Sequence, residues 1–287
     1  MAVPKDSSRV AHIFHAHAYV LDAAMEQPVR DKTGRQGLVE LPPDGKYQFQ
    51  SALPFQLFGV LSYRSGYTQV AGHKSLKGPG HTTLTTSVVE DLNVLDVVTA
   101  DRVVGQISTE HPLDGTVPSV TFLGTRFVNL RIGGHKVDVD TDLHILGPKP
   151  PKDKSYLEDA GVLMRMSQQY AKIRKTKDLP DWAQDHFGRD NGLVPSEGRA
   201  SCSLVKAVHG APGVSFGHVI DVPNFGKIFL GELSVHRKSA QNKDEDDAYH
   251  FRLTMMRLEM GCLGTGTAKI AAMDTNGRGS GGGGGGG

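Results

Sequence analysis

Cysteine is scarce in this sequence of 287 residues, and long apolar runs and an excess of charge are also missing. The two cysteines, Cys202 and Cys262, are too few for a disulfide-based scaffold or a four-cysteine zinc site. No apolar run approaches the roughly 18 residues of a membrane-spanning helix, so we expect no membrane insertion. Thirty-two basic and 31 acidic residues leave a net charge of +1, which gives no overall field for a polyanion. We therefore expect no nucleic-acid partner.

The two ends of the sequence show no sign of a folded core. Residues 1–10 contain Lys5 and Arg9 without the apolar stretch of a secretory signal, so no signal peptide is expected in this chain. Residues 276–287 are mostly glycine, which predicts a disordered tail. Localisation stays open: cytoplasmic residence is the default, and secretion is the alternative if a leader has been removed.

Short runs rich in Val, Ile, Thr and Phe, separated by Gly, Pro, Asn and Asp, dominate the chain and predict strands joined by turns. We expect a mainly β fold, built as a sandwich, a barrel or an irregular β-helix-like structure, with one α-helical insertion. Residues 11–22 carry apolar side chains on both faces at a period of two, which predicts an inner strand. The later predicted strands are residues 202–208, 214–221, 227–237, 249–260 and 265–273.

Two turns are predicted from their residue types. Residues 90–93, Glu-Asp-Leu-Asn, are expected to join two strands, and Gly133-Gly134 is a two-residue turn of a type that needs positive φ. The flanking strands are residues 82–89 and 95–108 for the first turn, and 126–132 and 135–143 for the second. In the last of these strands, apolar residues alternate with lysine and aspartate, so one face of its sheet is expected to meet solvent.

Residues 152–196 change the apolar period from two to about 3.6, which predicts helix. Ser155 and Glu158 have the spacing of a capping box, and Pro180 is typical of the first turn of a second, short helix. The predicted buried stripe of the first helix is Tyr156, Ala160, Leu163, either Met166 or Ser167, Tyr170 and Ile173. The chain is thus divided into a β-rich region (1–151), a helical insertion (152–196), a second β-rich region that completes the same domain (197–275) and the tail (276–287).

Histidine is the residue type that most suggests chemistry, because the chain has 13 of them. His15 and His17 lie on one face of the first predicted strand, with Cα atoms about 7 Å apart. Two ligands of one metal ion can have this spacing, so His15 and His17 are the candidate metal ligands. No motif marks the remaining ligands, and hydrogen-bonded strand histidines are the alternative interpretation.

Other motifs fail when their context is considered. The series Asp138, Asp140 and Asp142 starts like a calcium loop, but Leu143 stands where that loop needs glycine. Gly213-Val-Ser215-Phe-Gly217 has the letters of a nucleophile elbow, but it lies in a predicted strand with no helix after it. The sequence therefore predicts no catalytic residue and no cofactor.

Residues 82–108 (TTLTTSVVEDLNVLDVVTADRVVGQIS) and 122–137 (FLGTRFVNLRIGGHKV) together resemble the β-rich bacterial surface proteins called choice-of-anchor P, over about a quarter of the chain. The resemblance implies a secreted protein without known catalytic residues, so it supplies no site. We expect this chain to differ from that family in its helical insertion and in the signal peptide, which is not expected here.

Two functions stay open at this point. We favour a non-catalytic structural or interaction protein, a homo-oligomer or the binder of a protein partner. The alternative is a metal-dependent enzyme or carbohydrate-binding protein that uses His15 and His17. Residues 241–247, at the tip of a predicted hairpin, carry four acidic side chains and one lysine, which discourages strand addition there. Association is therefore expected through strand faces elsewhere.

Overall fold

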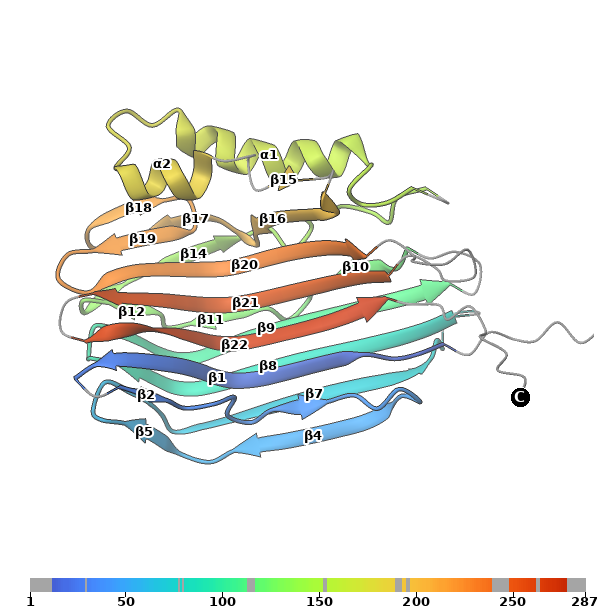
Figure 1. Cartoon of the computed structure of the whole chain (residues 1–287), viewed down its shortest axis with the longest axis horizontal. Coiled ribbons are helices and arrows are strands. Elements are labelled where there is room, and N and C mark those ends of the chain that lie inside the picture. The colour runs from blue at the N-terminus through green and yellow to red at the C-terminus, as the bar shows by residue number, and fades with distance from the viewer. Residues whose placement is uncertain are drawn as a thin grey trace, which may run out of the picture.

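The computed structural model describes residues 12–28, 30–76, 78, 80–112, 117–151, 154–188, 193–194, 197–238, 248–261 and 264–277. Within them the protein is mainly β with two helices, as expected (Figure 1). Two antiparallel sheets, each of ten strands in the described part of the chain, pack face to face around a shared apolar core. Of the three β architectures predicted, the structure has the sandwich.

The first sheet is built on four long strands in the order β20-β21-β22-β1. They are β1 (Ala16–Gln27), β20 (Gly226–Lys238), β21 (Ala248–Gly261) and β22 (Thr265–Gly277). Because β1 pairs with β22, the two ends of the described chain lie side by side, and Asn276 and Gly277 belong to the sheet. The shorter strands are β2 (Asp31–Lys32), β3 (Val39–Glu40), β15 (Leu193–Val194), β16 (Arg199–Ser203), β18 (Val214–Phe216) and β19 (Val219–Val222).

The second sheet is centred on the long hairpin of β8 (Gly80–Val94) and β9 (Val98–Pro112). On one side of this hairpin lie β7 (Ser65–Lys74) and then β4 (Lys46–Ala52). The other strands of this sheet are β5 (Phe55–Leu57), β6 (Leu61–Tyr63), β10 (Ser119–Thr121), β11 (Arg126–Val128), β12 (Arg131–Ile132) and β13 (His135–Lys136). A separate two-stranded sheet pairs β14 (Asp138–Thr141) with β17 (Val205–His209).

The turn between β8 and β9 was predicted at residues 90–93, and this position is wrong. The strands stay paired up to Val94 and Val98, and the turn lies at Leu95-Asp96, where φ is 54° at both residues. Asn93 and Asp96 hold this turn together. The Asn93 Nδ2 donates to the Asp96 carboxylate at 2.6 Å, and the Asp96 backbone N–H donates to the Asn93 Oδ1 at 2.9 Å. This reciprocal pair stabilises a turn that contains no glycine and lies beyond the four residues, 90–93, on which the prediction was based.

The Gly133-Gly134 turn is confirmed, with φ of 55° and 79°. Its strands are much shorter than predicted, because β12 and β13 pair over only two residues. After Val137 the chain leaves the second sheet, and β14 pairs with β17 instead. The predicted alternation still holds there: Val137 is buried, whereas Asp138 and Asp140 are exposed.

The pleat of the first sheet shifts by one residue along a line through four neighbouring strands. The line is formed by Val20, Ala271, Met255 and Gly231, none of which pairs in register although their neighbours do. Gly231 and Ala271 adopt left-handed backbone conformations, with φ of 62° and 49°. Such an irregularity redirects the side chains that follow it. On β20 it brings Glu232 to the outer face, toward the helices.

Helices α1 (Ala160–Arg174) and α2 (Asp181–Gly188) lie above β16 and β18, at one edge of the first sheet (Figure 1). Ser155 and Glu158 do interact, since the Ser155 N–H donates to the Glu158 carboxylate at 3.2 Å. However, they stabilise a turn that precedes the helix. The N-cap of α1 is Asp159, whose side chain accepts from the Val162 N–H at 2.9 Å.

This later start shifts the buried face of α1 from the predicted one. Met166, Tyr170 and Ile173 are buried as predicted, but Val162 replaces Leu163, which is only half-buried. The physical reason is the cap: with Asp159 fixed outside the first turn, residues 162, 166, 170 and 173 face the sheet.

Several sequence features fall outside the described residues, namely Cys262, the acidic tip 241–247 and the chain after Gly277. Cys202 is buried and has a free thiol. None of the helices in the described ranges has the length and apolar character needed to cross a membrane.

Candidate functional site

The two predicted metal ligands lie close together at the start of β1. His15 is exposed, His17 is half-buried, and their ring centroids are 6.1 Å apart. The structure groups His15 with His250 and Asp274, whose ligand atoms all lie within 4.8 Å of one another. His17 instead stacks on Tyr19 at 6.4 Å. The structure thus brings His15 into a three-residue cluster without His17, and a metal-binding role for the pair stays a prediction.

This surface cluster has internal partners. The buried Asp274 carboxylate accepts from the Arg252 Nε at 3.2 Å and lies 3.5 Å from the His250 Nδ1. Burial raises the pKa of Asp274, but the hydrogen bond with His250 and the charge of Arg252 outweigh this and hold the pKa below its usual value. The carboxylate is therefore already neutralised by groups of the chain.

A second cluster is buried beneath the helices and combines three distant parts of the sequence. His186 comes from α2, His218 from the turn between β18 and β19, and Glu232 from β20; their ligand atoms also lie within 4.8 Å of one another. His218 is 0% exposed, and neither of its ring nitrogens has a hydrogen-bond partner among the described residues. The same holds for the Nε2 of His186. We call this set the buried triad.

Aromatic rings surround the buried triad. The ring of His218 stacks on Tyr170 at 6.1 Å, and the ring of His186 meets Phe187 edge-on at 4.7 Å. Burial lowers the pKa of His218 to about 3 and also lowers the pKa of His186. Both imidazoles are therefore neutral near pH 7, the form in which a ring nitrogen offers a lone pair.

Glu232 supplies the only carboxylate of the triad and is held by Arg257. The Arg257 Nε and Nη2 donate to the two carboxylate oxygens at 2.7 and 2.8 Å, and the guanidinium carbon lies 3.5 Å from the centre of the Phe229 ring. Burial raises the pKa of Glu232, but the hydrogen bonds and charge of Arg257 prevail and lower it. Glu232 is therefore an oriented, ionised carboxylate.

Sequence reasoning missed the buried triad because no motif joins its members. They lie on a helix, a turn and a strand, separated by 32 and 14 positions. The one available signal was Glu232 itself, an acidic residue in a strand that is otherwise mostly apolar around it.

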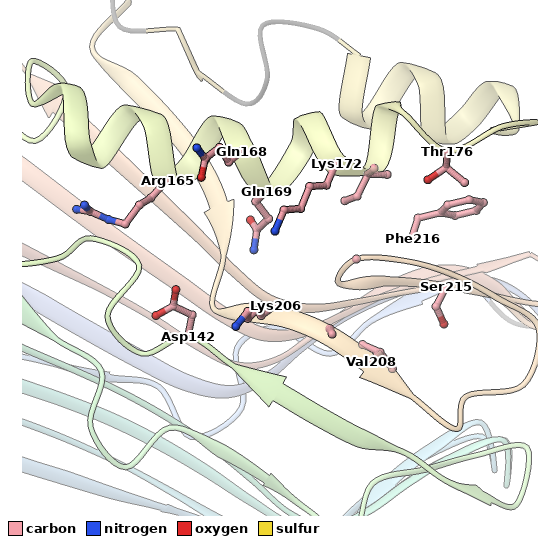
Figure 2. A pocket seen from close by; sticks show the side chains of 13 residues that line it. Asp142, Arg165, Gln168, Gln169, Lys172, Thr176, Lys206, Val208, Ser215 and Phe216 are labelled. Carbon is pink, nitrogen blue, oxygen red and sulfur yellow. The ribbon is translucent and has the colours of Figure 1, made fainter.

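A groove of about 410 Å³ separates α1 from β17 and β18 (Figure 2). Lys172 points into it from the helix, and Lys206 and Asp142 line the opposite side. The Arg165 Nε and Nη2 are committed to the backbone carbonyls of Ile145 and Leu146, at 2.8 and 2.7 Å. The cations left for a ligand are two exposed lysines, which makes the groove a poorly organised site.

Ser215 also lines this groove, and its surroundings bear on the elbow-like letters around it. It lies in β18, which continues through Gly217 and His218 into β19 as a hairpin. A nucleophile elbow needs a turn from strand to helix. The local geometry at Ser215 is therefore that of an ordinary strand residue.

The outer face of the second sheet carries a patch without charge. Tyr47 and Phe49 of β4 are 58% and 51% exposed, and the Phe49 ring stacks on Tyr67 at 5.8 Å. The uncharged patch, as we call it, consists of residues that lie side by side on four strands: Tyr47, Phe49 and Ser51 on β4, Tyr67, Gln69 and Ala71 on β7, Leu84, Thr86 and Val88 on β8, and Val104, Gln106 and Ser108 on β9. Their neighbours Thr68 and Val70 are fully buried, so the alternating patch residues point to the outer face. Thr86, Val88 and Val104 are nevertheless largely buried there, and the exposed part of the patch is centred on β4.

A third histidine cluster lies where the chain enters the sandwich. The ring of His12 stacks on His81 of β8 at 4.3 Å and lies 5.0 Å from His111 of β9. Burial, and to a lesser degree the charge of His81, lowers the pKa of His12 to about 4. This contact joins the segment before β1 to the second sheet.

A family model described as Domain of unknown function (DUF8256) matches residues 12–236. The chain belongs to this family. The matched span contains the whole buried triad and the uncharged patch, but it ends before His250 and Asp274 of the surface cluster. Neither the curated proteins nor the solved structures contain a match to the chain.

Proposed function

We propose that this protein is a non-catalytic interaction protein that self-associates through strand β4 and the uncharged patch beside it. The observation that carries the proposal is the edge strand itself. Six of the seven residues of β4 are exposed, and within the described residues it pairs with β7 alone. An edge strand presents a row of free N–H and C=O groups that a second strand can bind, unless charge or a covering segment prevents it.

The sequence of β4 does little to prevent such pairing. Lys46 is its only charged residue and stands at its first position, where it pairs with Asp44. Tyr47 and Phe49 follow with their side chains on the patch side. Exposed aromatic side chains of this kind are enriched at protein interfaces, because they bury much apolar area for little lost entropy.

A second copy of the chain fits this edge with twofold symmetry. An antiparallel β4–β4 contact centred on Phe49 sets Phe49 against its own copy and Tyr47 against Ser51 of the other protomer. Such an isologous contact closes as a dimer, rather than growing into a fibre. It also joins the two uncharged patches into one continuous surface.

The other surfaces of the sandwich suit self-association less well. The helices cover one edge of the first sheet, at the opposite end of the molecule from β4 (Figure 1). The resemblance of residues 82–108 and 122–137 to choice-of-anchor P proteins supports the same kind of role, a bacterial surface protein, and forms part of this proposal.

Sedimentation equilibrium over a wide range of concentrations tests the proposal. We expect the parent chain to dimerise, and a Tyr47→Lys/Phe49→Lys variant to be monomeric, with a dimer dissociation constant raised at least about 100-fold, or about 2.7 kcal/mol. Val214→Lys is the matched control, because Val214 is 55% exposed but lies on β18. Deletion of residues 241–247 should also leave the dimer intact. A parent chain that is monomeric at every concentration would contradict the proposal, and so would a double variant that dimerises normally.

The alternative function, a metal-dependent enzyme or a carbohydrate-binding protein at His15 and His17, has one supporting observation. This is the proximity of His15 to His250 and Asp274. Turnover of a substrate, or binding of a sugar, that is lost in His15→Ala would favour this alternative over self-association.

A further inference from the structure

We infer that His186, His218 and Glu232 form a binding site for a divalent transition-metal ion, and that zinc is the best match to this donor set. Two imidazole nitrogens and one carboxylate oxygen are ligands that zinc takes in proteins, in sites where three protein ligands leave a fourth position open. This inference is independent of self-association, because the buried triad lies under the helices and β4 lies at the other end of the molecule.

The first argument is the unsatisfied state of His218. A fully buried imidazole whose two nitrogens have no partner among the described residues is costly, because each buried polar group without a hydrogen bond has lost its contacts with water. Proteins keep such a group where something binds it. The Nε2 of His186 is a third nitrogen without a partner among the described residues, so the cost grows at one point of the structure.

The second argument is geometry. Ligand atoms within 4.8 Å of one another need only small side-chain rotations to converge on one ion, because zinc–nitrogen and zinc–oxygen bonds are about 2.0–2.2 Å long. His186 can make such a movement, since it is half-buried and stands on α2, a helix of eight residues. His218 and Glu232 are attached to the first sheet and supply the fixed part of the site.

The third argument is charge. Arg257 donates to Glu232 and also to Glu259, so these three groups carry a net charge of −1 beside two neutral histidines. A dication is attracted to that arrangement. Each oxygen of Glu232 keeps a further lone pair after binding Arg257, so the arginine can orient the carboxylate without blocking it.

The surface cluster is the weaker candidate by the same criteria. Asp274 already has Arg252 as a close partner, and His15 is exposed to water, so nothing in that cluster is left costly without an ion. A metal ion that binds this protein should therefore depend on His218 and His186 rather than on His15.

The test uses the full chain, stripped with a chelator and then titrated with Zn²⁺, and in parallel with Co²⁺ as a spectroscopic probe. We expect one equivalent of Zn²⁺ per chain, a visible Co²⁺ spectrum typical of imidazole coordination, and a melting temperature that rises on zinc addition. His186→Ala should weaken zinc binding at least 100-fold, and His218→Gln should abolish it. His15→Ala is the matched control and should bind zinc as the parent does.

Two results would overturn the inference. One is a folded parent chain, verified by circular dichroism, that takes up no stoichiometric Zn²⁺ or Co²⁺. The other is zinc binding that survives in His186→Ala but is lost in His15→Ala, which would assign the metal to the surface cluster. Because His186 is half-buried, we expect His186→Ala to fold. If His218→Gln fails to fold, the zinc affinity of His186→Ala tests the inference instead. The monomeric Tyr47→Lys/Phe49→Lys variant should bind zinc normally, so the two proposals can fail separately.

Discussion

The outer faces of the two sheets differ in how they are covered. The first sheet is covered at one edge by α1 and α2, and its uncovered part carries exposed charged residues such as Arg252 and Lys269. The second sheet has no helix over it in the described chain. Its outer face carries the twelve residues of the uncharged patch, of which Thr86, Val88 and Val104 are largely buried, next to the charged pair Glu90 and Arg102. A bare sheet face is normally polar and charged, so the uncharged patch is the exceptional part of the second sheet.

This difference underlies the two proposals made above. Beneath the helices, buried polar atoms of His218 and His186 lack hydrogen-bond partners among the described residues. A bound metal ion would supply those partners. In the uncharged patch of the second sheet, the exposed groups around Tyr47 and Phe49 carry no charge, which suits contact with another protein. The contrast predicts that substitutions under the helices lower the free energy of unfolding more than comparable substitutions at less buried positions. The variants below test this.

The largest effect is expected for a charge placed under α1. Met166 is fully buried, so Met166→Asp should lower the free energy of unfolding by about 4 kcal/mol, the cost of an unpaired buried charge. Leu163→Asp is the matched variant one turn away on a half-buried position, and we expect it to cost about 1 kcal/mol. Urea denaturation of both variants measures the difference, and equal losses would mean that α1 is not seated on the sheet as described.

The next effect compares an arginine in each region. Arg257→Met removes both hydrogen bonds to Glu232 and should cost about 2–3 kcal/mol, because it leaves that half-buried carboxylate unpaired. Arg102→Met removes a single bond of 2.6 Å to Glu90 on the exposed face of the second sheet, and should cost less than about 1 kcal/mol. Both are measured with a chelator present, so that metal binding does not contribute. A larger loss for Arg102→Met would reverse the contrast.

Measuring stability against pH examines the contact of His12, which precedes β1, with His81 and His111 of the second sheet. The pKa of His12 is about 4 in the folded chain and 6.5 ordinarily, so between these values the unfolded state binds the proton more readily. The neutral His12 ring therefore does not reduce the free energy of unfolding above pH 6.5, and this free energy falls as the pH drops from 6.5 toward 4. We expect a loss of about 2 kcal/mol, less than the full shift implies because the ring is partly exposed. His81, His111 and Lys74 face the same contact, so His12→Phe should flatten this part of the profile without abolishing it. A profile identical to that of the parent would exclude His12 as the cause.

Much of the fold could be predicted from the sequence, because strands and glycine turns are encoded locally. The Gly133-Gly134 turn follows from the need for positive φ, and the long strands follow from alternation. The turn at Leu95-Asp96 could not be predicted in the same way, because two reciprocal side-chain bonds from Asn93 and Asp96 replace glycine there. The position of Val162 depended on the choice between Ser155 and Asp159 as the helix cap, and both residues are competent caps.

The candidate sites were less accessible to sequence reasoning, because they depend on contacts between distant strands. His15 and His17 were found because they are two positions apart. The partners of His15 come from β21 and β22, more than 200 residues later. Glu232 reaches its place only because the pleat shifts at Gly231, and a strand pattern with a strict period of two does not contain that shift. The uncharged patch likewise exists only once β4, β7, β8 and β9 are in register.

The smallest effect compares two glycines with similar backbone conformations, one in each region. Gly134 has φ of 79°, and a Cβ added there meets nothing within 4 Å, so Gly134→Ala should cost only the left-handed strain, about 1 kcal/mol. Gly231 has φ of 62°, and an added Cβ lies 3.1 Å from the Val205 Cγ2 and 3.4 Å from the Ser203 Oγ, so Gly231→Ala should cost about 2 kcal/mol. Since the strain is nearly common to both, the difference of about 1 kcal/mol isolates the tight packing beside the pleat shift. Chemical denaturation of both variants resolves a difference of this size if their m-values agree. Equal losses would show that Val205 and Ser203 can move aside for a Cβ at Gly231 at no measurable cost in stability. The two regions would then differ in their charged groups but not in how tightly they are packed.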